Sequence, residues 1–456
     1  MADTVAVILA AGRGTRMHSG LAKALHELGG VSMVEHVVRA VRAAGLGKPR
    51  VVIGHQADRV EEELEGQAEF VRQSEMHGTG DAVAQALAAM DSDVKDVVVL
   101  VADCPLIPPA LIEEVLHIHH GSQAAATIVS MIVSNPAGYG RIVRGEDDGV
   151  SGIVEEKDAT HDPSLYQINE VNTGLGVWSV DGLAKLLDAL PWHQEERYLT
   201  DAVSRLIASG KRVEAYVAPD PARVMGINTR RDLAQAEAYL RELTLNRLFD
   251  QGVTIVDPSS TYVDVDVEVA QDTVIYPMTF LRGKTRIGRE CHVGPMTSIV
   301  SSRLGDGVKV DRSVVEQSSL ASHSSVGPFS HLRPGTSLDH NVKIGNFVEL
   351  KNTRVGTGSK AGHHSYLGDA TIGGGVNIGA GTVIVNFDGQ AKHPAFIGDG
   401  AFIGCNTNLV SPVEVGPNAY VAAGSTITQN VPPDALAIAR SRQENKPDWV
   451  RQRRKS

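Results

Sequence analysis

The stretch IGDGAFIGCNTNLVSPVEVG, residues 397–416, decides the fold, because an aliphatic residue returns in it at every sixth position. A period of six is neither the 3.6 of a helix nor the 2 of a plain strand. It is typical of a stacked repeat in which each hexad supplies one short strand and one turn, with the aliphatic side chain inside and glycine at the tight corner. The spacing predicts a parallel β-helix of hexapeptide repeats. The same ladder contains Val326, Leu332, Leu338, Ile344, Leu350, Ile397, Ile403, Leu409, Val415, Val421 and Ile427.

The repeat extends along most of the second half of the chain. Three hexads close one triangular coil, so residues 251–434 predict roughly ten coils stacked into a rod about 50 Å long. The ladder is interrupted after Ile384 by residues 386–394 and resumes at Ile397. An insertion that leaves a solenoid usually builds a binding loop.

The first half follows a different pattern. Apolar runs at Val5–Leu9, Val51–Ile53 and Val97–Val101 alternate with amphipathic stretches, one of them around Met33 and Val37. This order predicts an α/β Rossmann-like domain with a parallel sheet. Ligands of such sheets bind beyond the carboxyl ends of the strands.

Three segments follow from this change of pattern: a nucleotidyltransferase domain at 1–228, a linker helix at 229–250, and a β-helix domain with a C-terminal tail at 251–456. Thr229 and Asp232 resemble a capping box at the start of the helix. The helix carries an apolar stripe of Leu233, Ala236, Leu240 and Leu243. It could couple the two domains or belong wholly to the first, and the stripe alone does not decide.

Composition restricts the function classes. A net charge of -11 argues against a nucleic-acid partner, which needs a basic surface. The basic tail at 440–455 is an exception that a solvated terminus also explains. Three cysteines form neither a disulfide framework nor a metal motif, and neither a membrane span nor an export signal is present. We therefore expect a cytoplasmic protein with no membrane partner.

A glycine-rich loop follows the first strand. In LAAGRGTRM, residues 9–17, backbone N–H groups can cradle phosphates while Arg13 and Arg16 neutralise them. The loop lacks the Lys-Ser/Thr ending of a P-loop and the third glycine of a dinucleotide fingerprint. Lys23 follows, and Asp103 ends a strand, where a carboxylate can hold Mg²⁺ against a nucleotide phosphate. Taken singly, Asp103 could instead be a helix N-cap.

These segments together resemble the sugar-nucleotide pyrophosphorylases. The resemblance rests on the loop at 9–17, DCPL at 103–106, GYGR at 138–141, IVEEKDA at 153–159 and NTG at 172–174. It implies UTP as a substrate, with Mg²⁺ held by Asp103 and Asn228 and the phosphates surrounded by the catalytic residues Arg16 and Lys23. The implied nucleotide-sugar contacts are Leu9, Ala10, Ala11, Gly12, Lys23, Gln73, Gly78, Thr79, Gly140, Glu155, Asn172 and Asn228.

The rod carries a second candidate site. His363 and Ala380 are seventeen residues apart, about one coil, so they should lie on neighbouring coils, and Lys351 precedes His363 by two hexads. A lone histidine is usually surface decoration, but this one stands near Tyr366 and the interrupting loop. With an ordinary pKa near about 6.5, a histidine can take a proton from an ammonium nucleophile.

The second half resembles the hexapeptide acyltransferases, and the whole chain resembles the bacterial bifunctional enzymes that acetylate glucosamine-1-phosphate and then uridylylate the product. The motifs are HLRPG at 331–335, ELKN at 349–352, AGHHSYLGD at 361–369, VNIGAGT at 376–382 and NFDG at 386–389. The resemblance implies a left-handed coil, with His363 as general base and Glu349 orienting it. The implied glucosamine-1-phosphate contacts are Arg333, Lys351, Tyr366 and Asn377, and the implied acetyl-CoA contacts are Ala380, Asn386, Phe387, Cys405, Ala423 and Arg440.

The resemblance also implies a homotrimer through the β-helix and a product that supplies precursors of peptidoglycan and lipid A. Four positions depart from the family pattern: Cys405 replaces serine, Phe387 tyrosine, Ala22 proline, and Val101-Ala102 a Tyr-Gly pair. A thiol is a weaker donor than a hydroxyl, which affects the thioester contacts. No departure removes a charged or proton-transferring group.

Two other functions fit parts of the pattern. A sugar nucleotidyltransferase could use the rod only to oligomerise or to bind regulators, but the set of His363, Asn386 and Arg440 argues against it. A non-catalytic binding protein is disfavoured because Asp103 and Lys23 are both present.

Overall fold

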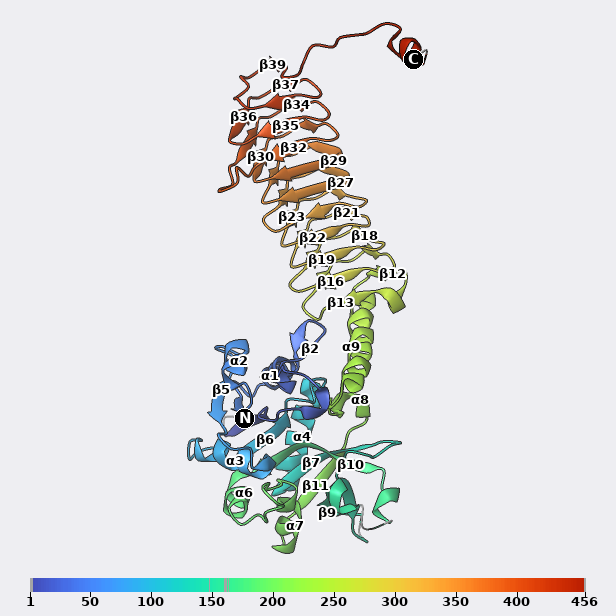
Figure 1. The fold of residues 1–456 in the computed structure, drawn as a ribbon. Coiled ribbons are helices and arrows are strands. Elements are labelled where there is room, and N and C mark those ends of the chain that lie inside the picture. The colour runs from blue at the N-terminus through green and yellow to red at the C-terminus, as the bar shows by residue number, and fades with distance from the viewer. Residues whose placement is uncertain (1–2, 147, 160–161, 163, 455–456) are drawn as a thin grey trace. The chain divides into compact units, whose positions relative to one another are not determined.

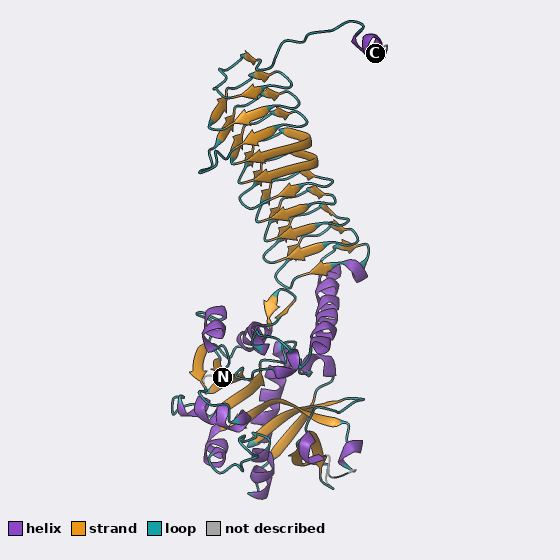
Figure 2. Cartoon of the chain, viewed as in Figure 1, coloured by secondary structure: helices purple, strands orange, loops and turns teal. Residues whose placement is uncertain are grey.

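The computed structural model describes residues 3–146, 148–159, 162 and 164–454 (Figure 1). The chain divides into two compact units, Met1–Leu240 and Arg241–Ser456. Lys455, the last basic residue of the tail, lies outside the described residues. Helices and strands are mixed in the first unit, whereas the second consists mainly of strands and turns (Figure 2).

The first unit is built on a mixed sheet with the strand order β11-β7-β10-β6-β1-β4-β5. Its strands are β1 (Thr4–Leu9), β4 (Arg50–Ile53), β5 (Glu69–Arg72), β6 (Asp96–Val101), β7 (Ala126–Ile132), β10 (Glu170–Ser179) and β11 (Val213–Val217). The expected parallel arrangement holds for β5-β4-β1-β6 and for β7-β11. The Rossmann-like prediction is therefore confirmed for these strands.

Strand β10 differs from the prediction because it runs antiparallel to both β6 and β7. A parallel partner needs a long crossover that packs on the sheet. The chain between β7 and β10 instead forms the hairpin of β8 (Arg141–Arg144) and β9 (Val150–Val154), followed by α5 (Glu156–Ala159). It therefore re-enters the sheet from the opposite end.

Helices cover both faces of the sheet, and the alternation of side chains along each strand explains the division. Ile8 of β1 faces a core with α1 (Met33–Ala43), α2 (Ala57–Glu63) and α4 (Pro109–Ser122). Its neighbour Val7 faces the opposite core with α3 (Gly78–Ala88), α6 (Val180–Leu187) and α7 (Asp201–Ala208). Each buried aliphatic side chain stabilises the unit by about 1.5–3 kcal/mol.

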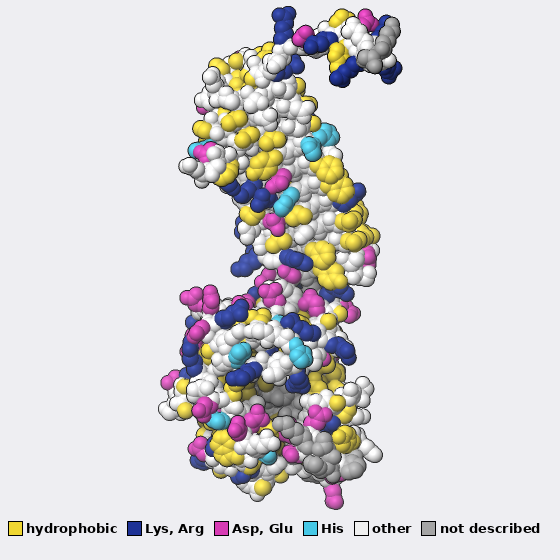
Figure 3. Space-filling view, viewed as in Figure 1, with side chains coloured by type: hydrophobic (Ala, Val, Ile, Leu, Met, Phe, Trp, Pro, Cys, Tyr) yellow, Lys and Arg dark blue, Asp and Glu magenta, His cyan; other side chains and the backbone are white. Residues whose placement is uncertain are grey.

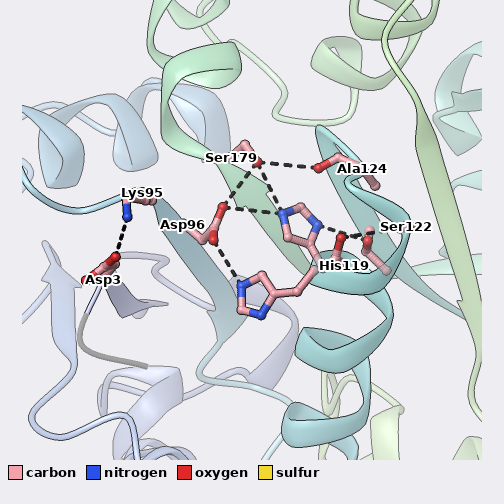
Figure 4. A network of polar contacts seen from close by, with 9 residues as sticks. Asp3, Lys95, Asp96, His119, Ser122, Ala124 and Ser179 are labelled. Carbon is pink, nitrogen blue, oxygen red and sulfur yellow. Dashed lines mark hydrogen bonds and ion pairs between the residues drawn. The ribbon is translucent and has the colours of Figure 1, made fainter.

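A polar network closes the amino-terminal edge of β6 and β10 (Figure 4). The buried ring of His119, on α4, binds Thr127 Oγ1 at 3.0 Å and Ser179 Oγ at 3.3 Å. Asp96 pairs with His120 at 3.0 Å and accepts a hydrogen bond from Ser179 at 3.1 Å. This network lies at the other end of β6 from Asp103, so we assign it a structural role.

The second unit is a parallel β-helix with three faces, each a stack of short strands. The first contains β12 (Thr254–Ile255), β15 (Val274–Ile275), β18 (His292–Val293), β21 (Lys309–Val310), β24 (Ser325–Val326), the starts of β27 (Lys343–Lys351) and β29 (Lys360–Gly368), β31 (Asn377–Ile378), β34 (Phe402–Ile403), β37 (Tyr420–Val421) and β39 (Leu436–Ala437). The second contains β13 (Tyr262–Val263), β16 (Phe280–Arg282), β19 (Ser298–Val300), β22 (Val314–Glu316), β25 (His331–Leu332), the ends of β27 and β29, β32 (Val383–Val385), β35 (Asn408–Val410) and β38 (Thr426–Ile427). The third contains β14 (Glu268–Val269), β17 (Arg286–Ile287), β20 (Arg303–Leu304), β23 (Ser319–Leu320), β26 (Ser337–Leu338), β28 (Arg354–Val355), β30 (Ala370–Ile372), β33 (Ala395–Ile397) and β36 (Val413–Val415).

Every aliphatic residue of the predicted ladder is buried in one continuous core. The hexapeptide-repeat β-helix is therefore confirmed. One coil is longer than the others: Asn377 pairs with Phe402, 25 residues on, whereas Phe402 pairs with Tyr420, 18 residues on. The additional residues include the insertion at 386–394, which leaves the stack as a loop in which Phe387 bridges to Lys392.

Helix α9 (Arg230–Asp250) begins in the first unit and ends in the second. The predicted capping box forms, since Thr229 Oγ1 accepts from Asp232 N at 3.2 Å and Asp232 Oδ2 accepts from Thr229 N at 2.8 Å. Ala236 packs in a core of the first unit, and Leu248 packs in the core of the β-helix. No helix in the described part of the chain is long and apolar enough to cross a membrane.

Candidate active sites

The carboxyl ends of β1 and β6 open into a cavity of about 530 Å³, within the usual size of a ligand site. The prediction that ligands bind beyond the strand ends led to this place. Of the residues expected to contact a nucleotide sugar, the cavity is lined by Leu9, Ala10, Ala11, Gly12, Lys23, Gln73, Gly78 and Thr79, and Asp103 lines it as well. Val101 and Ala102, two of the departures from the family pattern, are also in its wall.

Two glycines shape this cavity for a reason that is visible in the backbone. Gly14 has a φ of 63°, and a Cβ there would lie 2.5 Å from Cβ of Lys23. Gly78 has a φ of 89°, and a Cβ there would lie 2.5 Å from the carbonyl oxygen of Arg197. Only glycine fits such positions without strain. The loop and the start of α3 therefore present backbone rather than side chains to a ligand.

A cluster of charged and amide groups lies at one side of the cavity. The Lys23 ammonium pairs with the Asp103 carboxylate and donates to Asn228 Oδ1 at 2.7 Å. Arg16 donates to the same Oδ1 at 2.8 Å. The structure thus brings together four residues predicted from distant segments. Two of them are cations suited to phosphate oxygens, and two supply oxygen atoms suited to a divalent cation.

The oxygen atoms of Asp103 and Asn228 fit a Mg²⁺ ion. Both lie within hydrogen-bonding distance of one ammonium, so one cation reaches both. Mg²⁺ is usually held by one or two protein oxygens and completes its octahedron with substrate phosphates and water. The described residues contain no cluster of three or more His, Cys, Asp or Glu side chains that could hold a metal alone. The N-cap alternative for Asp103 is wrong, because Pro108 is the N-cap of α4.

A smaller cavity of about 120 Å³ adjoins the first, and Leu9, Thr79 and Val101 line both. The predicted sugar contacts Glu155 and Asn172 are in its wall. Gly140 is next to them, since its carbonyl oxygen accepts from Asn172 N at 2.9 Å.

Two residues of this region were missed by the sequence analysis. Thr200 donates to Glu155 Oε1 at 2.7 Å and so orients that carboxylate. Tyr139 packs behind Asp103, where burial first and the neighbouring Cys104 second raise the pKa of its phenol to about 12. Tyr139 was visible in the GYGR motif, but nothing in the sequence indicated that its ring lies beside the metal ligands.

In the β-helix, His363 lies on β29 between the first and second faces. Its Nδ1 is 2.5 Å from Oδ1 of Asn346, which occupies the same position one coil earlier. Glu349, the residue expected to orient the ring, instead pairs with Arg333 at 3.0 Å. That expectation was wrong because Glu349 is aligned with Tyr366, not with His363. An amide that accepts from Nδ1 leaves Nε2 as the basic nitrogen.

A cationic cluster suited to a phosphate lies on the second face and the inserted loop. Lys392 lies beside Lys351, and this ammonium first, with Arg333 to a smaller extent, lowers the pKa of Lys351. Lys392 was missed because the loop that carries it has no repeat from which its direction could be deduced. Like charges held together without a counterion indicate an anion site.

The base of the inserted loop is tied to the coil below it. Asn386, which is 6% exposed, donates to Asp369 Oδ2 at 2.5 Å and lies 3.5 Å from the Tyr366 hydroxyl. Within the loop, Asp388 accepts from His393 at 2.7 Å and from the N–H groups of Gln390 and Ala391 at 2.7 Å each. The loop is therefore ordered before any ligand binds, and it presents an exposed Phe387.

The remaining predicted acetyl-CoA contacts form a column at one corner of successive coils. Ala380 O accepts from Asn406 N, next to Cys405, at 2.7 Å. Cys405 O accepts from Gly424 N, next to Ala423, at 2.8 Å. A Cβ on Gly424 would lie 3.8 Å from Cδ of Arg440, so the column ends at the predicted phosphate partner. Cys405 is exposed there.

One predicted residue is not on the face with the others. Asn377 pairs with Lys360 and Phe402 on the first face, whereas Arg333, Lys351 and Tyr366 belong to the second. His363 lies at the corner between these two faces. A single chain therefore does not present the four expected glucosamine-1-phosphate contacts on one surface.

Comparison with known proteins agrees with both halves of the chain. Residues 6–146 match the family described as MobA-like NTP transferase domain, and residues 394–429 match the bacterial transferase hexapeptide family. Three curated relatives, each named "Bifunctional protein GlmU", are 46% identical to this chain. That of Brevibacillus brevis aligns over 99% of this chain and 98% of its own length. Those of Acetivibrio thermocellus and Shouchella clausii align over 98% and 99% of this chain, and over 97% and 99% of their own lengths.

Proposed function

The chain belongs to the family of bifunctional GlmU proteins, and from this membership we propose how its two units divide the work. It is a bifunctional transferase. One reaction converts acetyl-CoA and glucosamine-1-phosphate to N-acetylglucosamine-1-phosphate and coenzyme A. The other converts UTP and N-acetylglucosamine-1-phosphate to UDP-N-acetylglucosamine and pyrophosphate. The observation that carries this function is the 46% identity over 99% of the chain.

We propose that the cavity of the first unit binds UTP and the acetylated sugar phosphate side by side. The backbone of residues 9–12 and 78–79 would hold the uridine, and Gly140, Glu155 and Asn172 would hold the sugar in the smaller cavity. A sugar-1-phosphate oxygen then attacks the α-phosphorus, and pyrophosphate leaves. Arg16 and Lys23 would stabilise the charge that develops on the transferring phosphate. Little covalent work remains for the protein, so positioning supplies most of the acceleration.

Asp103 and Asn228 would hold Mg²⁺ at the edge of this cavity. When bound, the ion would neutralise charge on the triphosphate. Lys23 now pairs with Asp103, and it is positioned to transfer its contact to a phosphate when a substrate arrives. This exchange of partners is the role that we assign to Lys23.

In the β-helix unit we propose His363 as the general base of acetyl transfer. Nε2 would take a proton from the ammonium of glucosamine-1-phosphate, the amine would attack the thioester carbonyl, and coenzyme A would leave as the thiol. Arg333 and Lys351, together with Lys392, would bind the phosphate, and Tyr366 would contact the sugar. Asn386, Phe387 and the column of Ala380, Cys405, Ala423 and Arg440 would bind acetyl-CoA.

We further propose that the enzyme is a homotrimer whose acetyltransferase sites lie between subunits. The placement of Asn377 on a different face from Tyr366 supports a shared site, because a neighbouring chain can supply the missing contact. Large hydrophobic side chains are exposed on the β-helix, as Figure 3 shows for one side, among them Met278, Met296, Phe329 and Phe347. Exposed apolar surface of this kind is typical of an interface.

We also propose that both reactions take place in the cytoplasm. All three cysteines, Cys104, Cys291 and Cys405, are free thiols, which fits a reducing compartment.

Two assays on one preparation test the function. Coenzyme A release is measured with acetyl-CoA and glucosamine-1-phosphate, and pyrophosphate release is measured with UTP, N-acetylglucosamine-1-phosphate and Mg²⁺. We expect both products. Release of pyrophosphate without coenzyme A would support the alternative in which the rod only oligomerises, and release of neither would refute the function. Sedimentation of the full chain checks the trimer.

A further inference from the structure

The wall of the larger cavity contains one buried side chain whose orientation decides which base it can bind. Gln73 follows β5, is 5% exposed and lines the cavity. A carboxamide offers two N–H donors at one end and a carbonyl acceptor at the other. The end that faces the cavity therefore determines the hydrogen-bonding pattern that a ligand must present.

The neighbours of Gln73 determine this orientation. Its Nε2 donates to Asp81 Oδ2, on the first turn of α3, at 2.8 Å and has the Gly78 carbonyl oxygen at 3.5 Å. Gln85, one turn further along α3, donates to the same Oδ2 at 2.7 Å. An ionised carboxylate only accepts, so a reversed carboxamide would place its oxygen against the oxygen of Asp81. Asp81 thus keeps Nε2 on its own side and leaves Oε1 as the end available to a ligand.

An acceptor at this position distinguishes the pyrimidine bases. Uracil and thymine carry a hydrogen on N3, between two carbonyl oxygens, whereas N3 of cytosine is an acceptor beside an amino group. The first N–H groups of α3 have no acceptor within the helix, and Gly78 and Thr79 of that turn line the cavity. These donors suit the carbonyl oxygens of uracil and oppose the amino group of cytosine. A cytosine therefore cannot satisfy Oε1 and the helix end together.

We propose that Asp81 is a positioning residue that makes the uridylyltransferase select bases with a hydrogen on N3, by fixing the carboxamide of Gln73. The proposal rests on the uridylyl transfer proposed above, and it names a residue that does not itself touch the substrate. Leaving a buried acceptor facing another acceptor costs enough to change selectivity by about ten- to hundredfold.

The test compares UTP with CTP in Asp81→Asn. Asparagine has nearly the same shape but can both donate and accept, so Gln73 becomes free to present either end. Pyrophosphate release with N-acetylglucosamine-1-phosphate and Mg²⁺ gives kcat/KM for each nucleotide. We expect the UTP-to-CTP ratio to fall by about tenfold or more, through a loss with UTP and a gain with CTP. Asp81→Glu keeps a group that only accepts and should retain the ratio even if its activity falls.

A matched control removes the same charge elsewhere. Asp181 also lies in the first turn of a helix, α6, where its side chain is 91% exposed and pairs with Lys185. Asp181→Asn should leave the ratio unchanged. Because both nucleotides are measured on one preparation, the ratio does not depend on the fraction of folded enzyme. A ratio in Asp81→Asn within twofold of the wild type refutes the inference, whereas a wild type that releases no pyrophosphate from UTP refutes the proposed function instead.

Discussion

Replacing Asn346 tests how the β-helix prepares His363 for proton transfer. The short contact between Asn346 Oδ1 and Nδ1 of the ring joins two coils, and the residues are directly aligned in β27 and β29. If the amide accepts from Nδ1–H, the ring is held with Nε2 unprotonated and directed away from the contact. Asn346→Ala removes this support and leaves the base in place, whereas His363→Ala removes the base itself.

The two replacements should differ in size. A general base contributes about 10² to 10⁴ in rate, so His363→Ala should reduce acetyl transfer by at least about 10². A single hydrogen bond is worth about 0.5–1.5 kcal/mol net, which corresponds to about two- to tenfold in rate for Asn346→Ala. Asn346→Asp keeps an acceptor but adds a negative charge, which stabilises the protonated ring. The acid limb of its pH–rate profile should therefore move to higher pH.

Coenzyme A release by the full chain, followed by chromatography from about pH 6 to pH 9, measures all three variants. Pyrophosphate release by the same samples reports whether the chain is intact. An acetylation rate in His363→Ala within a few-fold of the wild type would refute the assignment of the base. An unshifted acid limb in Asn346→Asp would show that Asn346 does not support the ring.

Three further predictions concern carboxylates with different roles. Asp103→Asn should reduce pyrophosphate release by about 10² or more and leave coenzyme A release intact; equal loss of both would contradict a role in the first site. Asp388→Ala should loosen the inserted loop and raise KM for glucosamine-1-phosphate by about tenfold with kcat little changed, and a loss confined to kcat would argue against it. Asp96 is partly buried, but hydrogen bonds from His119 and His120 hold its pKa below the ordinary value of 3.8. Its stabilising contribution is present above that value and is lost as pH falls through the lower pKa of the folded state, so the Tm difference between wild type and Asp96→Asn should shrink on acidification; a constant difference would contradict the linkage.

The parts of the fold that the sequence predicts well are those that repeat. Ile344, Leu350 and Ile403 are in the core because a period of six places every such residue inside. The first unit was predictable where apolar runs alternate with helices, as at β1 and β6. The reversal of β10 was not, because strand direction depends on the path of the intervening chain, and a hairpin and a crossover are not distinguished by apolar spacing.

The candidate sites were predictable only in part, for a related reason. Motifs identified Lys23, Asp103 and His363 because a resemblance carries residues one by one. Partners such as Asn346 and Lys392 depend on which side chains meet across coils or from a loop, and spacing gives the alignment of coils only approximately. The expected role of Glu349 was wrong for this reason.

The repeated register of the β-helix separates the length of this unit from its chemistry. Val274 is aligned with His292 and Ser325 with Lys343, in each case 18 residues further on. A residue is thus addressed by its coil and by its position within the coil, like a character by line and column. Loss of one whole coil near the start, such as residues 274–291, would shorten the stack by one strand spacing, about 4.8 Å, and leave every neighbour in the acetyltransferase site in place. Loss of a single residue would instead shift all later side chains to a different column. Duplication or deletion of complete lines is therefore a route by which such a rod can change its reach while its chemistry stays the same.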